Sequence, residues 1–387
     1  LDIFLSPDKD FDKSGVYSGS ALVHDDKLYI YYTGNVKEVG DYDYVYKGRQ
    51  HNTVLVLSED GMSVESRQVV LYNKDYPEDM SCHVRDPKVF AYEGRFYMVL
   101  GARSKDDKGQ VLVYESKDLY DWHYINSIKT EYDFGYMWEC PDLFLLDGKW
   151  VLLLSPQGIA RKEFEAQNVY TNGYFILEGD FRSDYSLSEY RDLDFGFDFY
   201  ACQTFEKDDK RYMLAWMGMP DAEYTAPTIE AGWQHAMTCF RELALKDNKL
   251  IIKPVKELDD MFEKPLDYIV NKSIEINLET YAFDLNINKI NSGFSLNFSG
   301  ELDLVYEDKV LKLIHKDNAY GRTERKLYCE EIKELRVLAD TSSIEVFVNS
   351  GMYTMTSRYY PKSKSPCLSF KGNATLSIAL LKEAYKL

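Results

Sequence analysis

Four copies of one short unit recur along the chain. Each copy opens on polar residues, continues as a strand-like run, turns on polar residues or glycine, and returns as a second run rich in aromatic and aliphatic residues. The copies occupy residues 17–32, 84–99, 138–153 and 201–216, and they align without a gap. A hairpin that recurs at intervals of roughly 60 residues predicts a β-propeller, in which each blade is one antiparallel sheet.

Further strand-like runs lie between these hairpins. Residues 53–57 and 111–114 are apolar runs that end before polar turns. Each repeat therefore offers the four strands that a blade requires. Insertions at residues 35–50, 132–137 and 221–232 are predicted to be loops at the rim of a pocket.

The repeat ends around residues 253–258, and a short helical or irregular connector is expected through Pro265. Short strands with polar turns and no cluster of chemically active residues follow, which predicts a β-sandwich. These strands are expected at residues 273–278, 310–314, 335–338 and 344–348. We therefore predict an all-β chain with a propeller domain at residues 1–260 and a sandwich domain at residues 261–387.

The charge balance narrows the range of partners. The formal net charge is −18 at pH 7. This charge argues against nucleic acid and anionic membranes as partners, because binding to phosphate groups needs a basic face. A neutral small molecule such as a sugar is compatible with it. No apolar run approaches the roughly 20 residues of a membrane span.

Cysteine and histidine usage argues against a metal centre. The six cysteines lie apart without Cys-x-x-Cys spacing, and the six histidines show no metal-ligand spacing. Scattered cysteines favour a reducing, cytoplasmic location. A phosphate-binding glycine loop and a serine nucleophile elbow are also absent from the sequence. Neither a metal nor another cofactor is implied.

Candidate site residues follow from the repeat. In a propeller the first strand of each blade lies beside the central channel, so the starts of these strands converge on one axial pocket. Two carboxylates and an arginine are therefore predicted to face that pocket. The residues at these starts are Ser18, Arg85, Asp86, Glu139, Cys202 and Gln203.

Asp86 and Glu139 are the candidate catalytic carboxylates. Pro87 is expected to restrict Asp86 to an extended conformation and so to hold its carboxylate in one direction. Glu139 follows Trp138 in an apolar stretch, which we expect to desolvate it as a general acid requires. Two plainer interpretations stay open. Asp86 can belong to a surface pair with Arg85, and Glu139 can be the partner of Arg85, which is compatible with acid catalysis.

Other residues are weaker candidates. Tyr17, Ser18 and Gln203 offer hydrogen bonds to a substrate, and Trp216 offers an aromatic surface for a sugar ring. Each of these residue types is more often a packing residue than a ligand contact. Asp142 lies past the channel end of its strand, so we assign it a structural role.

Motifs spread over nearly the whole chain share the order found in one known family. They are Gly15-Val-Tyr-Ser-Gly-Ser-Ala21, Arg85-Asp-Pro87, Trp138-Glu-Cys-Pro-Asp-Leu143, Asp194-Phe-Gly-Phe-Asp-Phe-Tyr-Ala-Cys-Gln203, Ala215-Trp-Met-Gly218, Gly232-Trp-Gln-His235, Arg241-Glu-Leu243, Asp340-Thr-Ser-Ser-Ile-Glu-Val-Phe-Val-Asn349 and Thr356-Ser-Arg358. By these motifs the chain resembles glycoside hydrolase family 32, the invertase and sucrose-6-phosphate hydrolase family. Each motif alone is weak, but their common order makes the match specific.

The resemblance implies a fold and a reaction. The fold would be that of a five-bladed propeller joined to a β-sandwich, with about four blades present here. The reaction would be retaining hydrolysis of a terminal β-fructofuranoside without a cofactor. Glu139 would be general acid and then general base, and Asp86 would stabilise the transition state through fructosyl hydroxyls. Arg85, Tyr17 and Ser18 would bind the substrate. Retaining chemistry places the nucleophile about 5–5.5 Å from the acid.

The chain departs from the family at the nucleophile. The family's nucleophile is the aspartate of an Asn-Asp-Pro-Asn-Gly motif in the first blade, and the sequence lacks this motif. Asp8, Asp10 and Asp12 lie outside the repeat, and none is assigned as the nucleophile. With no initiator methionine either, we expect a missing first blade and a gap that faces Asp86 and Glu139. The 387 residues are expected to be inactive, and roughly 60 upstream residues are expected to restore activity.

Three functions stay open from the sequence. The first is hydrolysis of sucrose or sucrose 6-phosphate, for which only a basic cluster at the pocket rim would select the phosphorylated sugar. The second is inverting hydrolysis of arabinosides by a five-bladed glycosidase, with carboxylates about 6.5–9.5 Å apart. The third is a carbohydrate-binding propeller without catalysis. The sequence predicts no oligomeric state.

Overall fold

The computed structural model describes residues 3–316 and 319–385, which form antiparallel sheets joined by loops and short 3₁₀ helices. By their contacts the residues divide into two compact units. Unit 1 comprises residues 1–159 and 173–191, and unit 2 comprises residues 160–172 and 192–387. No helix in the described part of the chain is long and apolar enough to span a membrane.

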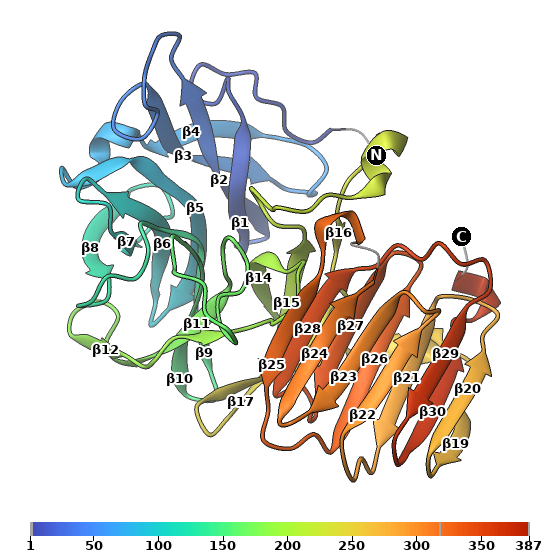
Figure 1. Cartoon of the computed structure of the whole chain (residues 1–387). Coiled ribbons are helices and arrows are strands. Elements are labelled where there is room, and N and C mark those ends of the chain that lie inside the picture. The colour runs from blue at the N-terminus through green and yellow to red at the C-terminus, as the bar shows by residue number, and fades with distance from the viewer. Residues whose placement is uncertain (1–2, 317–318, 386–387) are drawn as a thin grey trace. The chain divides into compact units, whose positions relative to one another are not determined.

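Unit 1 contains three antiparallel sheets whose strands follow one another in chain order (Figure 1). The first sheet is β1 (Val16–His24), β2 (Lys27–Lys37), β3 (Arg49–Ser58) and β4 (Ser66–Leu71), followed by η1 (Asn73–Asp75); the second is β5 (Met80–Tyr92), β6 (Arg95–Ser104), β7 (Gly109–Ser116) and β8 (His123–Ile128); the third is β9 (Met137–Leu146), β10 (Lys149–Gln157), β11 (Gly173–Gly179) and β12 (Tyr185–Leu187). This order is that of a propeller blade. The predicted hairpins and the additional strands of this part are confirmed.

The first strand of each sheet in unit 1 carries a bulge. On β5 the pairing with β6 shifts register between Arg85 and Lys88, and similar shifts occur on β1 and β9. Asp86 lies in this bulge with a φ of +62°, and Cys140 lies in the bulge of β9 with a φ of +48°. The extended conformation predicted from Pro87 is therefore wrong, because the bulge takes Asp86 out of the strand ladder and re-aims its side chain.

Apolar side chains from these strands pack into buried clusters. One cluster includes Tyr31, Leu55, Met98, Leu100 and Leu112, and another includes Val99, Val111, Trp138, Leu152 and Phe175. Successive side chains of a strand point to opposite faces of its sheet, so neighbours such as Met98 and Val99 enter different clusters. This alternation directs Glu139 away from the core that its neighbour Trp138 enters.

Unit 2 begins with a fourth sheet of the same type. It consists of β14 (Tyr200–Lys207), β15 (Lys210–Met217), β17 (Arg241–Lys246) and β18 (Lys249–Pro254), and the short β16 (Ala236–Met237) pairs with β15. The fourth predicted hairpin, at residues 201–216, is confirmed. The predicted loop at residues 221–232 includes the 3₁₀ helix η2 (Pro227–Ala231). The two-residue strand β13 (Arg191–Asp192), which precedes this sheet in the chain, pairs with β11 of the third sheet.

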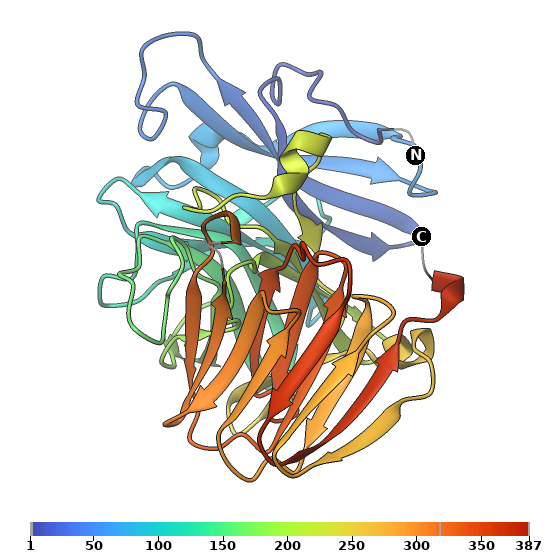
Figure 2. The ribbon, with the colours of Figure 1, turned by 45° about the vertical axis from the view of Figure 1, so that its right-hand side comes forward.

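The rest of unit 2 is a β-sandwich of two six-stranded sheets (Figure 2). One sheet is β19 (Leu266–Val270), β30 (Ala374–Leu380), β21 (Phe283–Asn288), β26 (Glu334–Asp340), β27 (Ser343–Val348) and β28 (Tyr353–Arg358); the other is β20 (Ser273–Asn277), β29 (Cys367–Lys371), β22 (Phe294–Phe298), β23 (Leu302–Glu307), β24 (Val310–His315) and β25 (Glu324–Tyr328). Buried side chains of both sheets form one core. The predicted sandwich and its strands are confirmed, and η4 (Ala319–Gly321) and η5 (Glu383–Tyr385) lie in its loops and end.

Arg241, on β17, joins the blade-type sheet to the sandwich within unit 2. Its buried guanidinium donates to Glu345 Oε2 at 2.7 Å and to Thr356 Oγ1 at 2.6 Å. Thr356 Oγ1 in turn donates to Asp194 Oδ2 at 2.6 Å. Three motifs that lie far apart in the sequence therefore meet in one buried network, which gives each of them a structural role.

The change from blade-type sheets to the sandwich occurs between the end of β18 at Pro254 and the start of β19 at Leu266, across η3 (Lys256–Met261). The predicted boundary near residue 260 falls in this connector. The compact units divide at other points, at residues 160 and 192. The boundary of the two domains stays a prediction.

Candidate active site

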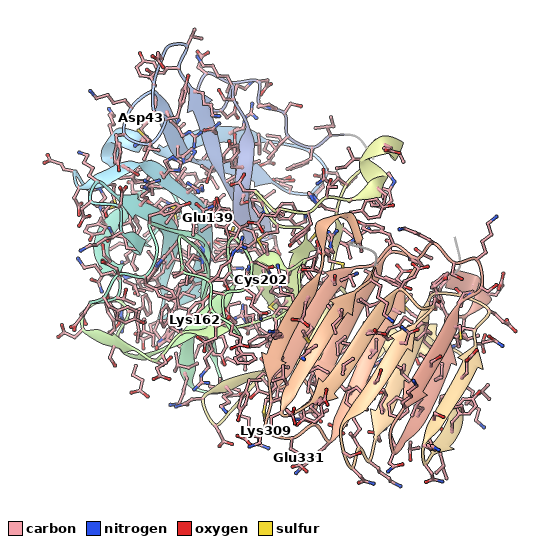
Figure 3. All side chains as sticks on the ribbon, in the orientation of Figure 1. Asp43, Glu139, Lys162, Cys202, Lys309 and Glu331 are labelled. Carbon is pink, nitrogen blue, oxygen red and sulfur yellow. The ribbon has the colours of Figure 1, made fainter. Side chains whose placement is uncertain are left out.

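Arg85 holds two carboxylates in unit 1. Its Nη2 donates to Glu139 Oε1 at 2.5 Å, and its Nε lies 3.8 Å from Asp86 Oδ2. Glu139 is labelled in Figure 3, among the strands of unit 1. Burial lowers the pKa of Arg85, but the charges of Glu139 and Asp86 outweigh burial and raise it overall, so the guanidinium is charged. These three residues are adjacent, and their roles stay predictions.

Asp86 is buried and has one carboxylate oxygen bound by the protein. Its Oδ2 accepts a hydrogen bond from the backbone N–H of Cys140 at 2.9 Å, and its own N–H donates to Thr33 Oγ1 at 2.9 Å. Burial raises the pKa of Asp86, although Arg85 opposes this shift. Oδ1 takes no part in these contacts, so it can accept a hydrogen bond from a hydroxyl of a bound molecule.

Polar partners hold both carboxylate oxygens of Glu139. Arg85 binds Oε1, and Gln157 Nε2 donates to Oε2 at 2.8 Å. The fully buried Trp138 side chain points to the opposite face of β9, and the Glu139 side chain is 15% exposed. The desolvation expected for a general acid stays a prediction. The alternative interpretation, that Glu139 is the partner of Arg85, is confirmed. Gln157 was not predicted, although its place at the end of the second strand of the same hairpin is a usable signal.

Asp142 follows Glu139 on β9, farther from the start of the strand. Its side chain is fully buried, and its Oδ2 lies 2.9 Å from Lys88 Nζ on β5. The ion pair connects the first strands of two neighbouring sheets of unit 1. These contacts support the structural role that we predicted for Asp142.

The weaker candidates lie in both units. Tyr17 and Ser18 are exposed on β1, and the Tyr17 ring packs 5.6 Å from the ring of His51. Gln203 on β14 and Trp216 on β15 belong to unit 2 and are partly buried. As ligand contacts, these four residues stay predictions.

Sequence reasoning missed two histidines and an arginine beside Arg85. Arg85 Nη1 donates to His83 Nδ1 at 2.7 Å, and Arg49 Nη1 lies 3.3 Å from His83 Nε2. The ring of His51 lies 5.5 Å from the ring of His83. The spacing of the histidines in the sequence bears only on metal binding, which it does not favour. A usable signal was their position, at the starts of β3 and β5 near the predicted loop at residues 35–50.

Comparison with protein families decides the class of this chain. A model of the glycosyl hydrolases family 32 N-terminal domain matches residues 1–254, and a model of the family's C-terminal domain matches residues 284–382. The chain belongs to glycosyl hydrolase family 32. The resemblance seen in the motifs is confirmed, and this family 32 protein is a glycoside hydrolase with propeller-type sheets and a C-terminal sandwich.

Two curated relatives of the family 32 chain are bacterial. The sucrose-6-phosphate hydrolase of Bacillus subtilis (strain 168) is 37% identical over 383 residues, which cover 93% of the chain and 77% of that protein. The sucrose-6-phosphate hydrolase of Salmonella typhimurium is 36% identical over 385 residues, covering 96% of the chain and 78% of that protein.

Two solved structures are also similar to the family 32 chain. The structure of sucrose-6-phosphate hydrolase from Lactobacillus gasseri has a TM-score of 0.88 and 26% identity, covering 98% of the chain and 80% of that structure. The GH32 β-fructofuranosidase of Bombyx mori has a TM-score of 0.82 and 28% identity, covering 95% of the chain and 79% of that structure. The fold is therefore shared along nearly the whole of the present chain.

Proposed function

We propose that the family 32 chain binds a terminal β-fructofuranoside, sucrose or sucrose 6-phosphate, at Arg85, Asp86 and Glu139. The contact of one buried guanidinium with two carboxylates carries this proposal. It is supported by relatives that are named sucrose-6-phosphate hydrolases. It is also supported by a structure of a Bombyx mori β-fructofuranosidase variant in complex with sucrose.

The proposed reaction is retaining hydrolysis in two steps. In the first step a carboxylate nucleophile attacks the anomeric carbon, the bond from that carbon to the glycosidic oxygen breaks, and Glu139 gives its proton to the leaving oxygen. In the second step Glu139 takes a proton from water, and that water cleaves the fructosyl ester. Asp86 accepts hydrogen bonds from fructosyl hydroxyls through Oδ1, and its negative charge stabilises the oxocarbenium-like transition state.

We propose further that the 387 residues alone bind the sugar but do not hydrolyse it. This proposal rests on the nucleophile motif of the family, which the sequence lacks. The runner-up function, a carbohydrate-binding protein without catalysis, is favoured by the same observation. Both functions predict binding, so only the restoration of turnover separates them.

The test compares two chains. One is the 387-residue chain, and the other, the extended chain, carries a family segment of about 60 residues with the Asn-Asp-Pro-Asn-Gly motif ahead of Leu1, one repeat interval in length. Both should bind sucrose in calorimetry, and only the extended chain should release fructose. The extended chain with the motif aspartate changed to asparagine is the control.

Three results would contradict these proposals. Fructose release by the 387-residue chain would show that it contains a nucleophile. An extended chain that folds and binds sucrose without turnover would favour the binding protein. An α-anomer as the first product in NMR would establish inversion instead of retention.

We also propose that the protein is located in a reducing compartment such as the cytoplasm. The structure pairs none of the six cysteines, all of which lie in its described part, in a disulfide bond. Disulfide bonds are rare in such compartments, so cysteines outside disulfide bonds agree with this location. Fractionation of the source cells with an antibody against the chain would test it, and recovery from the medium would contradict it.

A further inference from the structure

Arg85 and Gln157 contact different oxygens of Glu139. Arg85 Nη2 donates to Oε1 at 2.5 Å, and Gln157 Nε2 donates to Oε2 at 2.8 Å. The two partners differ in their chemistry. A guanidinium group can only donate hydrogen bonds, whereas an amide can donate through its nitrogen or accept through its carbonyl oxygen. These contacts therefore bear on which oxygen of Glu139 can carry a proton.

Arg85 directs a proton on Glu139 to Oε2. A general acid must hold a proton on one of its two carboxyl oxygens before it gives that proton away. The guanidinium of Arg85 is charged, and a charged donor binds a carboxyl group more strongly through the oxygen that has no proton. Oε1, which accepts from Arg85, therefore stays the acceptor. The protonated form of Glu139 then carries its proton on Oε2, next to Gln157.

Gln157 can bind Oε2 in both protonation states. Its Nε2 donates to Oε2 in the structure, which is the contact that suits an ionised carboxylate. A rotation of about 180° about the last bond of the side chain would exchange the nitrogen and the oxygen of the amide. The carbonyl oxygen would then accept a hydrogen bond from a proton on Oε2. A single amide thus serves a residue that alternates between acid and base.

The β9–β10 hairpin holds the main chain at Gln157. Gln157 pairs with Met137, so it is the diagonal neighbour of Glu139 on the same face of the sheet. The carbonyl oxygen of Gln157 accepts from the N–H of Tyr136 at 2.9 Å. A Cβ atom on Gly135, where φ is +74°, would lie 2.3 Å from that carbonyl oxygen. This close packing confines the exchange of donor and acceptor to the side chain.

The segment that packs against Gln157 is itself held from a third side. The guanidinium of Arg103 lies 4.7 Å from the centre of the Tyr136 ring, and Arg103 pairs with Asp107 at 2.8 Å. A Cβ atom on Gly158, the residue after Gln157, would lie 2.5 Å from Tyr136 Cδ1. The strand end that carries Gln157 is therefore fixed before a substrate binds, which is what a positioning residue requires.

We propose that Oε2 carries the proton that Glu139 gives and takes, and that Gln157 is the positioning residue for it. In the first step the Oε2–H bond breaks, the proton goes to the leaving oxygen, and the electron pair stays on Oε2. Gln157 Nε2 donates to the negative charge that develops there. In the second step Oε2 takes a proton from the attacking water, and the amide turns its oxygen towards it. This inference rests on the proposed function, in which Glu139 is acid and then base.

The first test is Gln157→Met in the extended chain, which removes the amide and keeps the length of the side chain. We expect kcat and kcat/KM for sucrose to fall together by about 10- to 100-fold, as for a lost hydrogen bond to a charged group. KM should change less than about threefold, because the bond gains its strength only as the proton leaves. Gln68→Met, at an exposed position of β4 in the same unit, is the matched control.

A double variant separates an action through Glu139 from a structural role of Gln157. In an extended chain that already carries Glu139→Gln, the change Gln157→Met should lower the remaining turnover by less than about twofold, because no proton is left to position. A residue that only supports the fold would instead cause its full loss again in this background.

The pH profile gives a second readout that a structural role would not move. Gln157 Nε2 donates to the ionised form of Glu139, so its removal disfavours that form. The alkaline limb of kcat/KM, where the general acid loses its proton, should therefore move to higher pH in Gln157→Met by about half a unit to one unit. Gln157→Glu should move this limb further in the same direction, because a second carboxylate repels the ionised form.

Three outcomes would overturn the inference. They are turnover of Gln157→Met within about threefold of Gln68→Met, losses that multiply in the double variant, and an alkaline limb that does not move. Where Gln157→Met does not fold, the isosteric Gln157→Glu and its pH profile decide. An unchanged extended chain that shows no turnover would refute the proposed function, and this inference with it.

Discussion

At the scale of single residues, Asp86 and Glu139 differ in their burial and in their hydrogen-bond partners. Asp86 is bound by the protein at Oδ2 and has Oδ1 outside those contacts, whereas Arg85 and Gln157 bind both oxygens of Glu139. Two carboxylates in different settings can play different parts in one reaction, one as a proton donor and one as a fixed negative charge. The next two predictions test this division.

Replacing Glu139 by Gln in the extended chain should remove the proton donor and keep the side-chain shape. We expect turnover of sucrose to fall by about 10²–10⁴-fold, the usual contribution of general acid catalysis. A nitrophenyl fructoside, whose leaving group needs little protonation, should lose much less. Steady-state kinetics on both substrates measures the difference. Equal losses would mean that Glu139 acts in some way other than proton donation.

Asp86→Asn tests the cost of burying a charged carboxylate. Burial raises the pKa of Asp86 in the folded protein. The carboxyl group of Asp86 therefore binds its proton more tightly in the folded protein than in the unfolded chain. The stabilisation from protonated Asp86 is complete below the ordinary aspartate pKa of about 4 and is lost as the pH rises through the folded-state value.

The neutral isostere should accordingly raise the free energy of unfolding near pH 7.5 by about 1 kcal/mol. This gain should shrink as the pH falls towards and below about 4. Urea unfolding at both pH values measures it. Destabilisation at neutral pH would show instead that attraction to Arg85 outweighs burial. Sugar binding should weaken in the variant at neutral pH, since the fixed negative charge is gone.

At the scale of elements, the position of β9 beside β6 depends on close backbone approach. A Cβ atom on Gly101 of β6 would lie 2.1 Å from the carbonyl oxygen of Trp138, the residue before Glu139. The added Cβ atom and the Trp138 carbonyl oxygen are both fixed to the main chain, so the two strands would have to move apart. Any such movement carries Glu139 with it.

Gly101→Ala should therefore lower stability by about 1–3 kcal/mol, the range for overpacking, and weaken sucrose binding. The matched control is Gly94→Asn, in the turn between β5 and β6. There φ is +73°, which asparagine tolerates, and no atom lies within 4 Å of an added Cβ. Chemical unfolding and calorimetry measure both variants. Unchanged sugar affinity in a destabilised Gly101→Ala would show that β9 keeps Glu139 in place without this contact.

At the scale of the whole molecule, unit 2 is held together by charges buried far from water. Arg241 of the blade-type sheet pairs with Glu345 of the sandwich, and Asp194 completes the network. Removing one member of a buried pair leaves an uncompensated charge. We therefore expect the sheet and the sandwich to unfold cooperatively.

Arg241→Met should lower the stability of the chain by about 3–5 kcal/mol. Arg241→Lys should recover only part of this loss, because an ammonium group cannot reproduce the fork of hydrogen bonds to Glu345 and Thr356. Differential scanning calorimetry measures the effect. Met and Lys variants with the stability of the unchanged chain would contradict the role of the network.

The sequence by itself determined the blade-type hairpins, the sandwich strands and the matching places of Asp86 and Glu139 in the repeat. These features depend on alternation along single strands and on register within a repeat, and both are visible in a linear pattern. Hence the adjacency of Arg85 to both carboxylates was predictable, since all three residues lie at the starts of the repeated sequence units.

Only the tertiary structure decided which partners each side chain meets. Gln157, Arg49 and His51 reach the region of Arg85 from other strands, and the bulge at Asp86 sets a backbone angle that its own proline did not indicate. Bulges and loops shift side chains by distances as large as a hydrogen bond, and periodicity carries no information about such shifts. The contacts that define the site therefore emerge only when strands distant in sequence pack together.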